Sequence, residues 1–595
     1  MYGAGRSLQS VSRRAVLGSG AAGLAASSGC MQRLRTLAGR KESDALSLSI
    51  KTRPPDEDPG AIHIAQELET WFDTAGIDTT VQPVTAEELY RQTLFNHEFD
   101  AFIARYPYRQ VTADSLYSWL HSSFAAERGW QNPFGFSNLT VDELLTAQRR
   151  QSVDERTETV ETLQKRLADM CPYVVIGTPD SIRAANTTRF NDWSGAFGQS
   201  PLRLLTLGQA EPTATTLRLV TTDNRVTRNC NPLMASFRRR GQITDLMYDS
   251  LARRYRGELI PWAGADWEWD DTEGGDPVLR VTLREGLQWH DGEPLTASDV
   301  AFTYRMLADT SLGTFEQAVA PTRYRGRSSL VASAAVVDKQ TVELTYGDCS
   351  RSVATRALTV PLLAEHVWRD RAGRADIGGL DIGAPTTEAL VTDAVPPVGS
   401  GPLQFDTASD RDRIRLTLFS EHFSAKTDAS DTPAITAINP PFNAVEVQFV
   451  GSDSTAVELV ANGDADATAV GVGSDLVRSI GRADDVTLLL DQSDAFYFLG
   501  FNVRTAPFSN SRFRNLLSHL IDRKHLVDAV FDGYATPAVS PLAGTGLVPS
   551  ELRWEPGGTA TPFLGTDGRL DTAQVRSAFR EAGYRYDDAG NLLQP

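Results

Sequence analysis

The chain has 595 residues, 41% of them hydrophobic, so it is long enough to bury several cores, and two or three domains are expected. Its formal net charge is −18 and its isoelectric point is near 5.0, which makes nucleic acid and anionic lipid surfaces poor partners. Lysine occurs only six times, and this acidic, lysine-poor composition suggests a high-salt habitat, with an ordinary acidic extracellular protein as the alternative.

The first thirty residues carry an ordered set of export signals. Arg13 and Arg14 form a twin-arginine pair, and the apolar run from Ala15 to Ser27 behind them is too short to span a bilayer. The run ends in a sequence similar to a lipoprotein cleavage box, with Cys30 as the lipidated residue. Residues 1–30 are therefore predicted to be a Tat-type lipoprotein signal peptide. We expect the mature protein on the extracellular side of the cell membrane, held by an N-terminal lipid anchor.

Local patterns predict a strand at Leu46–Ile50, an amphipathic helix at Ala61–Gly76 and a second strand at Thr79–Val84. A further short strand is predicted at Leu217–Val220.

The most regular local unit of the chain is the strand–turn–helix pattern of residues 279–308. Apolar and polar residues alternate from Leu279 to Leu283, which is typical of a half-buried strand, and a tight polar turn of sequence His-Asp-Gly begins at His290. Thr296 and Asp299 then form a capping box, in which the two side chains satisfy free N–H groups of a helix start. The buried stripe of that helix would consist of Val300, Phe302, Thr303 and Met306.

Motifs for enzyme chemistry are missing from the sequence. There is no nucleophile elbow, no zinc-protease helix and no phosphate-binding loop, and the eight histidines are scattered. Cys171, Cys230 and Cys349 lie far apart without a C-x-x-C pair, so we expect buried free thiols and neither a disulfide framework nor a metal site. No cofactor is predicted, and the protein is interpreted as a non-enzyme.

Several of these stretches resemble one known family. The unit of residues 279–308, the turn Pro397–Leu403, the segment Phe496–Asn502 and the segment Arg512–Arg523 are similar to signatures of the peptide/nickel-type substrate-binding proteins of ABC transporters, family 5. The resemblance covers about residues 45–595, but its order is changed, because residues from about 213 resemble the start of a mature member and residues 45–190 resemble its end. We interpret the chain as a circular permutant in which residues 208–214 link the former ends, a rearrangement that neighbouring termini make easy. The alternative is two partial, unrelated domains.

The resemblance implies a two-lobed, type II periplasmic-binding-protein-like α/β fold with a smaller appended α+β domain, circularly permuted. The resemblance also implies a strand at Phe99–Ile103, helices at Asp114–Ser122 and Asp245–Leu251, and an end segment at Tyr173–Gly177. Under this interpretation the second lobe combines two distant parts of the chain. The expected divisions are 1–30 signal peptide, 45–190 second lobe, 191–250 linker and start of the main lobe, 251–395 appended domain, 396–495 main lobe and 496–595 second lobe.

The resemblance also implies the function. We expect a monomer that captures a small solute or peptide in the cleft between its lobes and delivers it to the transmembrane subunits of an ABC permease. The candidate ligand contacts are Tyr248, Phe496, Tyr497, Asn502, Tyr108, Arg109 and Trp119, with Tyr106 and Asn231 as further candidates. An extracellular hydrolase, or a sensory protein that docks to a membrane receptor, remains an alternative.

One departure from the family bears on the ligand. Peptide-binding members carry an Asp, in the loop before the Asp114–Ser122 helix, that receives the α-amino group of the peptide. No acid stands in the matching loop here, and Arg109 lies near that position. An arginine would repel an ammonium group and attract a carboxylate, so the sequence favours a ligand other than an ordinary peptide.

Overall fold

The computed structural model describes residues 45–107, 111–197, 201–234, 243–255, 257–270, 276–321, 323–375, 386–426, 439–492, 495–555 and 561–594. The predicted signal residues Arg13, Arg14 and Cys30 and the candidate contacts Tyr108 and Arg109 lie outside these ranges. Within them, no helix is both long enough and apolar enough to cross a membrane.

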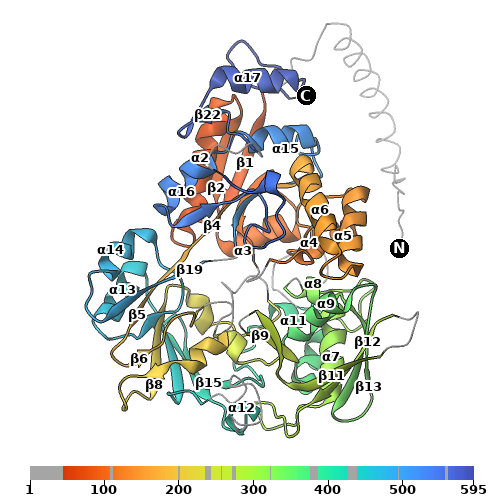
Figure 1. Cartoon of the computed structure of the whole chain (residues 1–595), viewed down its shortest axis with the longest axis vertical. Helices are drawn as coiled ribbons and strands as arrows, with labels where there is room; N and C mark the ends of the chain where they lie inside the picture. The colour runs from red at the N-terminus through yellow and green to blue at the C-terminus, as the bar shows by residue number, and fades with distance from the viewer. Residues whose placement is uncertain are drawn as a thin grey trace, which may run out of the picture.

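The upper lobe in Figure 1 is built around a six-stranded mixed sheet whose two faces are both covered by helices. Its strands, in spatial order, are β2 (Asp78–Pro83), β1 (Ser47–Thr52), β3 (Ala101–Arg105), β20 (Tyr497–Phe501), β4 (Tyr173–Pro179) and β21 (Ala535–Pro537). Its helices are α2 (Pro59–Thr74), α3 (Ala86–Tyr90), α4 (Ser115–Leu120), α5 (Leu139–Arg150), α6 (Arg156–Met170), α15 (Ser511–Ser518), α16 (Arg523–Phe531) and α17 (Thr572–Glu581), and the hairpin β22 (Gly565–Thr566) and β23 (Arg569–Leu570) lies between α16 and α17 in the chain.

Side-chain alternation explains why both faces of this sheet are covered. Leu499 and Phe501 of β20 enter one apolar cluster, which α2, α15 and α17 complete, whereas Phe498 enters a second cluster with α4, α5 and α6. Successive residues of a strand point to opposite faces, so a strand that is apolar at every position needs a layer on each side.

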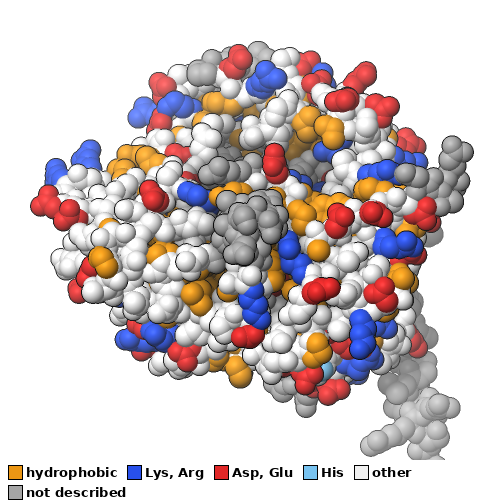
Figure 2. All heavy atoms as spheres, turned by 60° about the horizontal axis from the view of Figure 1, so that its bottom comes forward, with side chains coloured by type: hydrophobic (Ala, Val, Ile, Leu, Met, Phe, Trp, Pro, Cys, Tyr) orange, Lys and Arg blue, Asp and Glu red, His pale blue; other side chains and the backbone are white. Residues whose placement is uncertain are grey.

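The lower lobe contains a seven-stranded mixed sheet. Its strands, in order, are β15 (Leu403–Ser409), β16 (Arg413–Leu418), β17 (Ala444–Phe449), β8 (Thr216–Thr221), β18 (Ala467–Thr468), β5 (Ser181–Asn186) and β19 (Val486–Asp491). The associated elements are α12 (Phe423–Lys426), α13 (Asp453–Ala461), α14 (Val477–Ile480) and the hairpin β6 (Phe190–Asn191) and β7 (Gly208–Gln209). Acidic and basic side chains are interspersed over the face seen in Figure 2.

A smaller α+β unit adjoins the lower lobe, as Figure 1 shows in green. Its four-stranded antiparallel sheet has the order β11 (Gly264–Asp270), β12 (Val278–Leu283), β14 (Thr341–Tyr346) and β13 (Val331–Val336). The remaining elements are β9 (Ala252–Tyr255), β10 (Glu258–Pro261), α7 (Ala297–Ala308), α8 (Arg325–Ser328), α9 (Arg351–Ala354), α10 (Glu365–Trp368) and α11 (Glu388–Val391). Its core is continuous with that of the lower lobe, since Val281 and Phe302 belong to the same apolar cluster as Leu219 and Val445.

Nine short helical segments complete the described chain. They are the π-helical turn η1 (Arg91–Phe95) and the 3₁₀ turns η2 (Ser122–Phe124), η3 (Pro201–Thr206), η4 (Asn224–Thr227), η5 (Thr244–Leu246), η6 (Thr355–Thr359), η7 (Arg369–Ala372), η8 (Ser474–Leu476) and η9 (Ser550–Leu552). The predicted helix at Asp245–Leu251 is wrong, because only the short turn η5 forms there.

The strand–turn–helix prediction for residues 279–308 is confirmed. Helix α7 starts with a capping box between Thr296 and Asp299, and all four predicted stripe residues are buried. The imidazole of His290 docks the turn against residues 399–401. Its Nε2 lies 2.9 Å from the carbonyl oxygen of Gly401, and its Nδ1 lies 3.3 Å from the amide nitrogen of Gly399. The turn is therefore a structural element.

Two crossing segments connect the lobes. Strand β4 belongs to the upper sheet and β5 to the lower sheet, and only Asp180 separates them; β19 and β20 make the second crossing. The first crossing lies at Asp180, ten residues before residue 190, where the first part of the second lobe was expected to end. The extended segment that contains β4 and β5 supplies one strand to each sheet in turn. Both distant parts of the chain enter the upper sheet, where β20 pairs with β3 and with β4 (Figure 1).

Candidate functional site

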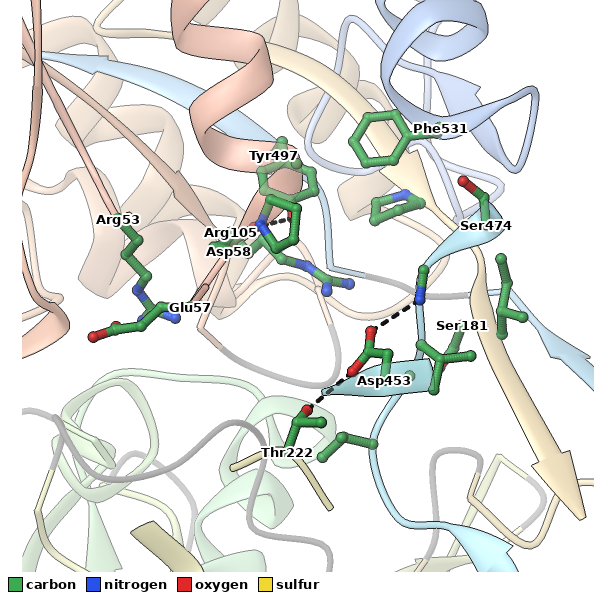
Figure 3. Close-up of a pocket in the computed structure, with 18 of the residues that line it drawn as sticks. Arg53, Glu57, Asp58, Arg105, Ser181, Thr222, Asp453, Ser474, Tyr497 and Phe531 are labelled. Carbon is green, nitrogen blue, oxygen red and sulfur yellow. Dashed lines mark hydrogen bonds between the residues drawn. The ribbon is translucent and has the colours of Figure 1, made fainter. Parts of the chain in front are cut away.

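A cavity of about 770 Å³ lies between the two lobes. The upper wall comes from the start of α2, the end of β3, the start of β20 and the end of α16, and the lower wall from the start of β5, the start of α13 and the loop 469–476. Figure 3 shows side chains from both walls pointing into the same space. A cleft between lobes is a common place for a small ligand to bind.

The upper wall is fixed by the cap of α2. The carboxylate of Asp58 accepts a hydrogen bond of 3.2 Å from the Ala61 amide, which satisfies one of the free N–H groups at the helix start. The same oxygen accepts a hydrogen bond of 2.6 Å from the Tyr497 hydroxyl, drawn as a dashed line in Figure 3. The Tyr497 ring is therefore held in place at the cavity wall, although 439 residues separate it from Asp58.

The guanidinium of Arg105 projects into the space between the lobes (Figure 3). Arg105 is the last residue of β3 and is paired in register with Tyr497. Its guanidinium carbon lies 5.3 Å from the centroid of the Tyr497 ring, within the range of a cation–π contact. The rigid strand and the ring together hold a positive charge at the centre of the upper wall.

The lower wall is organised by Asp453 at the start of α13. Its carboxylate accepts hydrogen bonds from the Thr222 hydroxyl at 3.2 Å and from the Gly473 amide at 3.0 Å. These bonds hold the loop 469–476 against the start of the helix. In that loop, the Ser474 hydroxyl donates a hydrogen bond of 2.8 Å to Asp532 of the upper lobe, so the cavity rim includes a direct contact between the lobes.

Charges of both signs line the cavity. The acids are Asp56, Glu57, Asp58, Asp180, Asp453, Asp475 and Asp532, and the arginines are Arg53, Arg105, Arg183 and Arg323. Burial raises the pKa of Asp180, and burial also raises the pKa of Glu57 against the opposing effect of Arg53 and Arg225. Among the described residues, no cluster of His, Cys, Asp and Glu is arranged to hold a metal ion. The lining is suited to a polar organic solute with several hydrogen-bonding groups.

A second contact between lobes joins the upper lobe to the smaller unit. The buried carboxylate of Asp114, beside α4, accepts a hydrogen bond of 2.7 Å from Arg149 of α5 and also pairs with Arg356 of η6. Nearby, Arg325 of α8 forms two hydrogen bonds, of 2.9 and 3.1 Å, with the carboxylate of Glu127. These ion pairs hold the upper lobe against the smaller unit.

Among the candidate ligand contacts in the described chain, Tyr497 lines the cavity, and so does the further candidate Tyr106. Four other candidates lie away from the cavity lining, because their side chains are buried in cores or hold backbone. Phe496 and Trp119 pack in the upper lobe, 5.7 Å apart between ring centroids; Asn502 donates to the carbonyl oxygens of His97 and Phe99; and the Tyr248 hydroxyl donates to the carbonyl of Cys230. The further candidate Asn231 bonds the backbone of residues 389 and 392, whereas Tyr106 is buried at the cavity edge.

Sequence reasoning missed most of the polar lining. Asp58 and Asp453 each stand at a helix start, so an N-cap signal was present, but nothing local shows that the two helix starts face one cavity. Arg105 lies two residues beyond the predicted strand Phe99–Ile103, and Ser474 lies in a glycine-rich loop without a recognisable motif. Their convergence depends on the pairing of distant strands.

The three free cysteines Cys171, Cys230 and Cys349 of the described chain are buried, as predicted.

Two α/β lobes, two crossing segments and a polar cavity between the lobes define the molecule as a two-lobed binding protein.

Comparison with known proteins identifies the family. Residues 258–593, more than half of the chain, match the model of the bacterial extracellular solute-binding proteins, family 5 Middle, and the chain belongs to this family. Among curated proteins, the glutathione-binding protein GsiB of Salmonella paratyphi A is 24% identical over 314 residues, which are 51% of this chain and 50% of the relative. GsiB of Escherichia coli K12 is 23% identical over 308 residues. The chain thus spans about half the length of the curated relatives that it matches.

Solved structures of low identity show partial similarity. NikZ from Campylobacter jejuni, in complex with Ni(L-His), has a TM-score of 0.45 and 17% identity, over 64% of this chain and 65% of that chain. The oligopeptide-binding protein AppA from Bacillus subtilis, in complex with a nonapeptide, has a TM-score of 0.42 and 17% identity, over 63% of this chain and 65% of that chain.

Proposed function

We propose that this protein captures a small polar solute in the cavity between its lobes and delivers it to an ABC permease, without catalysing a reaction. The single observation that carries the proposal is the cavity itself, a polar space whose walls come from both lobes of a member of a solute-binding family. Curated relatives named as glutathione-binding proteins support a peptide-like solute as the first candidate.

Binding would act by closing the lobes. A solute that touches both walls interacts more strongly with the closed arrangement than with the open one, and that difference shifts the population towards closure. The bond between Ser474 and Asp532 would form only when the lobes approach. A permease that recognises the closed shape would then distinguish loaded from empty protein.

The proposal includes the location and the monomeric state. Export by the Tat route through Arg13 and Arg14, with a lipid on Cys30, would place the protein at the extracellular side of the membrane, where a permease takes up solutes.

We also propose that the chain order is a circular permutation of the family. Three contacts support it: Ala45 bridges Leu593, the Leu46 amide donates to the carbonyl of Leu592 at 2.7 Å, and the Leu592 amide donates to Gly76 at 2.6 Å. The coverage of about half of GsiB agrees with a changed order, because a collinear comparison can align only one of two exchanged parts. A chain rebuilt as 213–594 followed by a short linker and 45–207 should fold and bind like the original, whereas a rebuilt chain that is unfolded would contradict the permutation.

Calorimetric titration with a solute panel tests the binding function. The panel contains glutathione, tri-alanine, a disaccharide and small organic acids, and a tight solute at saturating concentration should stabilise the protein by about 3–4 kcal/mol. Gly451 lines the cavity, and a Cβ added there meets no atom within 4 Å, so Gly451→Trp should place a bulky ring at the cavity wall without disturbing the backbone. Gly546 is outside the cavity and equally open, which makes Gly546→Trp the matched control.

We expect Gly451→Trp to abolish the binding that the wild type shows and Gly546→Trp to preserve it. Equal binding by all three proteins would place the solute elsewhere, and turnover of a panel member would contradict a pure binding function.

A further inference from the structure

Arg105 differs from the other arginines of the cavity. Arg53 donates to the Tyr90 hydroxyl, the Arg183 guanidinium lies 3.6 Å from Asp491, and that of Arg323 lies 3.7 Å from Asp245. No carboxylate among the described residues lies within 4.0 Å of the Arg105 guanidinium, in contrast to the guanidiniums of Arg183 and Arg323. The buried Nε of Arg105 makes no hydrogen bond with any described residue. Unsatisfied buried donors are uncommon and costly, so such a group at a cavity wall indicates a missing acceptor.

Other attractors of negative charge in the cavity are already neutralised by the protein. The start of α2 is capped by Asp58, and the start of α13 is capped by Ser452 with Asp453 in the first turn. A helix start attracts anions through its free N–H groups and its dipole, and these side chains supply that negative charge internally. Arg105 is therefore the place where a ligand anion meets an uncompensated positive charge.

The chemistry of Arg105 and its surroundings favours a carboxylate over other anions. A guanidinium is a planar fork of donors that matches the two oxygens of a carboxylate. The Tyr497 ring under it supplies an apolar surface for the carbon chain that carries the carboxylate. The cavity lining contains seven acids and four arginines, so its excess of negative charge repels a doubly charged phosphate more strongly than a singly charged carboxylate.

We propose that Arg105 is the anchor for a carboxylate of the bound solute, and that the solute is a carboxylic acid whose remaining polar groups face the acids of the cavity. This inference rests on the proposed function, because it takes the cavity between the lobes as the binding site. It assigns the anchor to β3 of the upper lobe.

The first test needs no ligand. Arg523 is a buried arginine of the same lobe that donates to the carbonyl oxygens of Val175 and Ala538 and to the Thr561 hydroxyl, so Arg523→Met should lower the melting temperature. Arg105→Met should leave the melting temperature of the ligand-free protein unchanged or raise it, because it removes a charge without a carboxylate partner and gives up only the contact with the Tyr497 ring. A fall as large as that of Arg523→Met would show that Arg105 is structural and would overturn the inference.

The second test uses matched probes in calorimetric titrations: tri-alanine against tri-alanine amide, lactate against lactamide, and inorganic phosphate. The wild type should bind the free acid of a pair about ten- to one-hundred-fold more tightly than its amide, and Arg105→Met should remove that preference. Equal affinity for acid and amide would overturn the inference and leave the proposed function intact. Binding of phosphate in preference to both acids would also overturn it. If no solute of either panel binds, the proposed function fails, and the ligand-free comparison still decides whether Arg105 is structural.

Discussion

Substitution of Asp114 tests whether buried ion pairs hold the upper lobe against the smaller unit. Its side chain is 1% exposed and pairs with two guanidiniums, those of Arg149 and Arg356. Burial lowers the pKa of each arginine to about 10, so both remain charged at neutral pH. Asp114→Asn keeps the volume but leaves two buried cations without a counter-ion, and breaking a buried ion pair in this way costs about 3–5 kcal/mol.

Urea unfolding followed by circular dichroism measures this loss as a shift of the midpoint. The matched control is Asp348→Asn, which breaks the pair of Asp348 with Arg150, whose side chains are 63% and 54% exposed. The control should lose less than about 1 kcal/mol, because exposed ion pairs contribute little. If Asp114→Asn unfolds at the same urea concentration as the control, the account of this interface is refuted.

Three further predictions concern single side chains. Burial lowers the pKa of His290 from 6.5 to about 4, so the contribution of the neutral imidazole to stability is complete above pH 6.5 and is lost as the pH falls towards 4. Urea unfolding at pH 7.5 and at pH 5.0 should show that the stability advantage of the wild type over His290→Gln shrinks by about 1–3 kcal/mol at the lower pH. An advantage that is the same at both pH values would contradict this prediction. Thr296→Ala removes one side of the capping box of α7 and should cost about 0.5–2 kcal/mol in the same assay, whereas no loss would mean that the cap is not needed. Ser474→Ala removes the bond to Asp532 and should weaken solute binding about two- to tenfold in calorimetry without changing the unfolding midpoint, and unchanged affinity would show that this bond does not help closure.

Much of the fold was predictable because its signals are local. The capping box of Thr296 and Asp299 and the alternating strand before it identify their elements within about thirty residues. The end of the first crossing was not predictable, since the extended run through Asp180 changes sheets without a change in sequence pattern.

The site was less predictable because its residues meet only through long-range pairing. Phe496, Tyr497 and Phe498 are three adjacent aromatics, and their sequence does not show which one reaches the cavity. The structure answers through alternation: Phe496 and Phe498 enter one core, whereas Tyr497 points to the other face, where its hydroxyl meets Asp58 at the cavity wall. The pairing of β20 with β3 decides that Arg105 lies beside it.

Capture of the solute by closure of the two lobes can be tested by measuring the distance between them. Cysteines introduced at the exposed positions Asp528 of α16 and Glu458 of α13 can carry spin labels, since the three native cysteines of the described chain are buried. Pulsed electron–electron double resonance then gives the distance between the two labels with and without a solute that calorimetry has shown to bind. Closure should give one shorter and narrower distance distribution on binding, and an identical distribution in both states would contradict capture by closure.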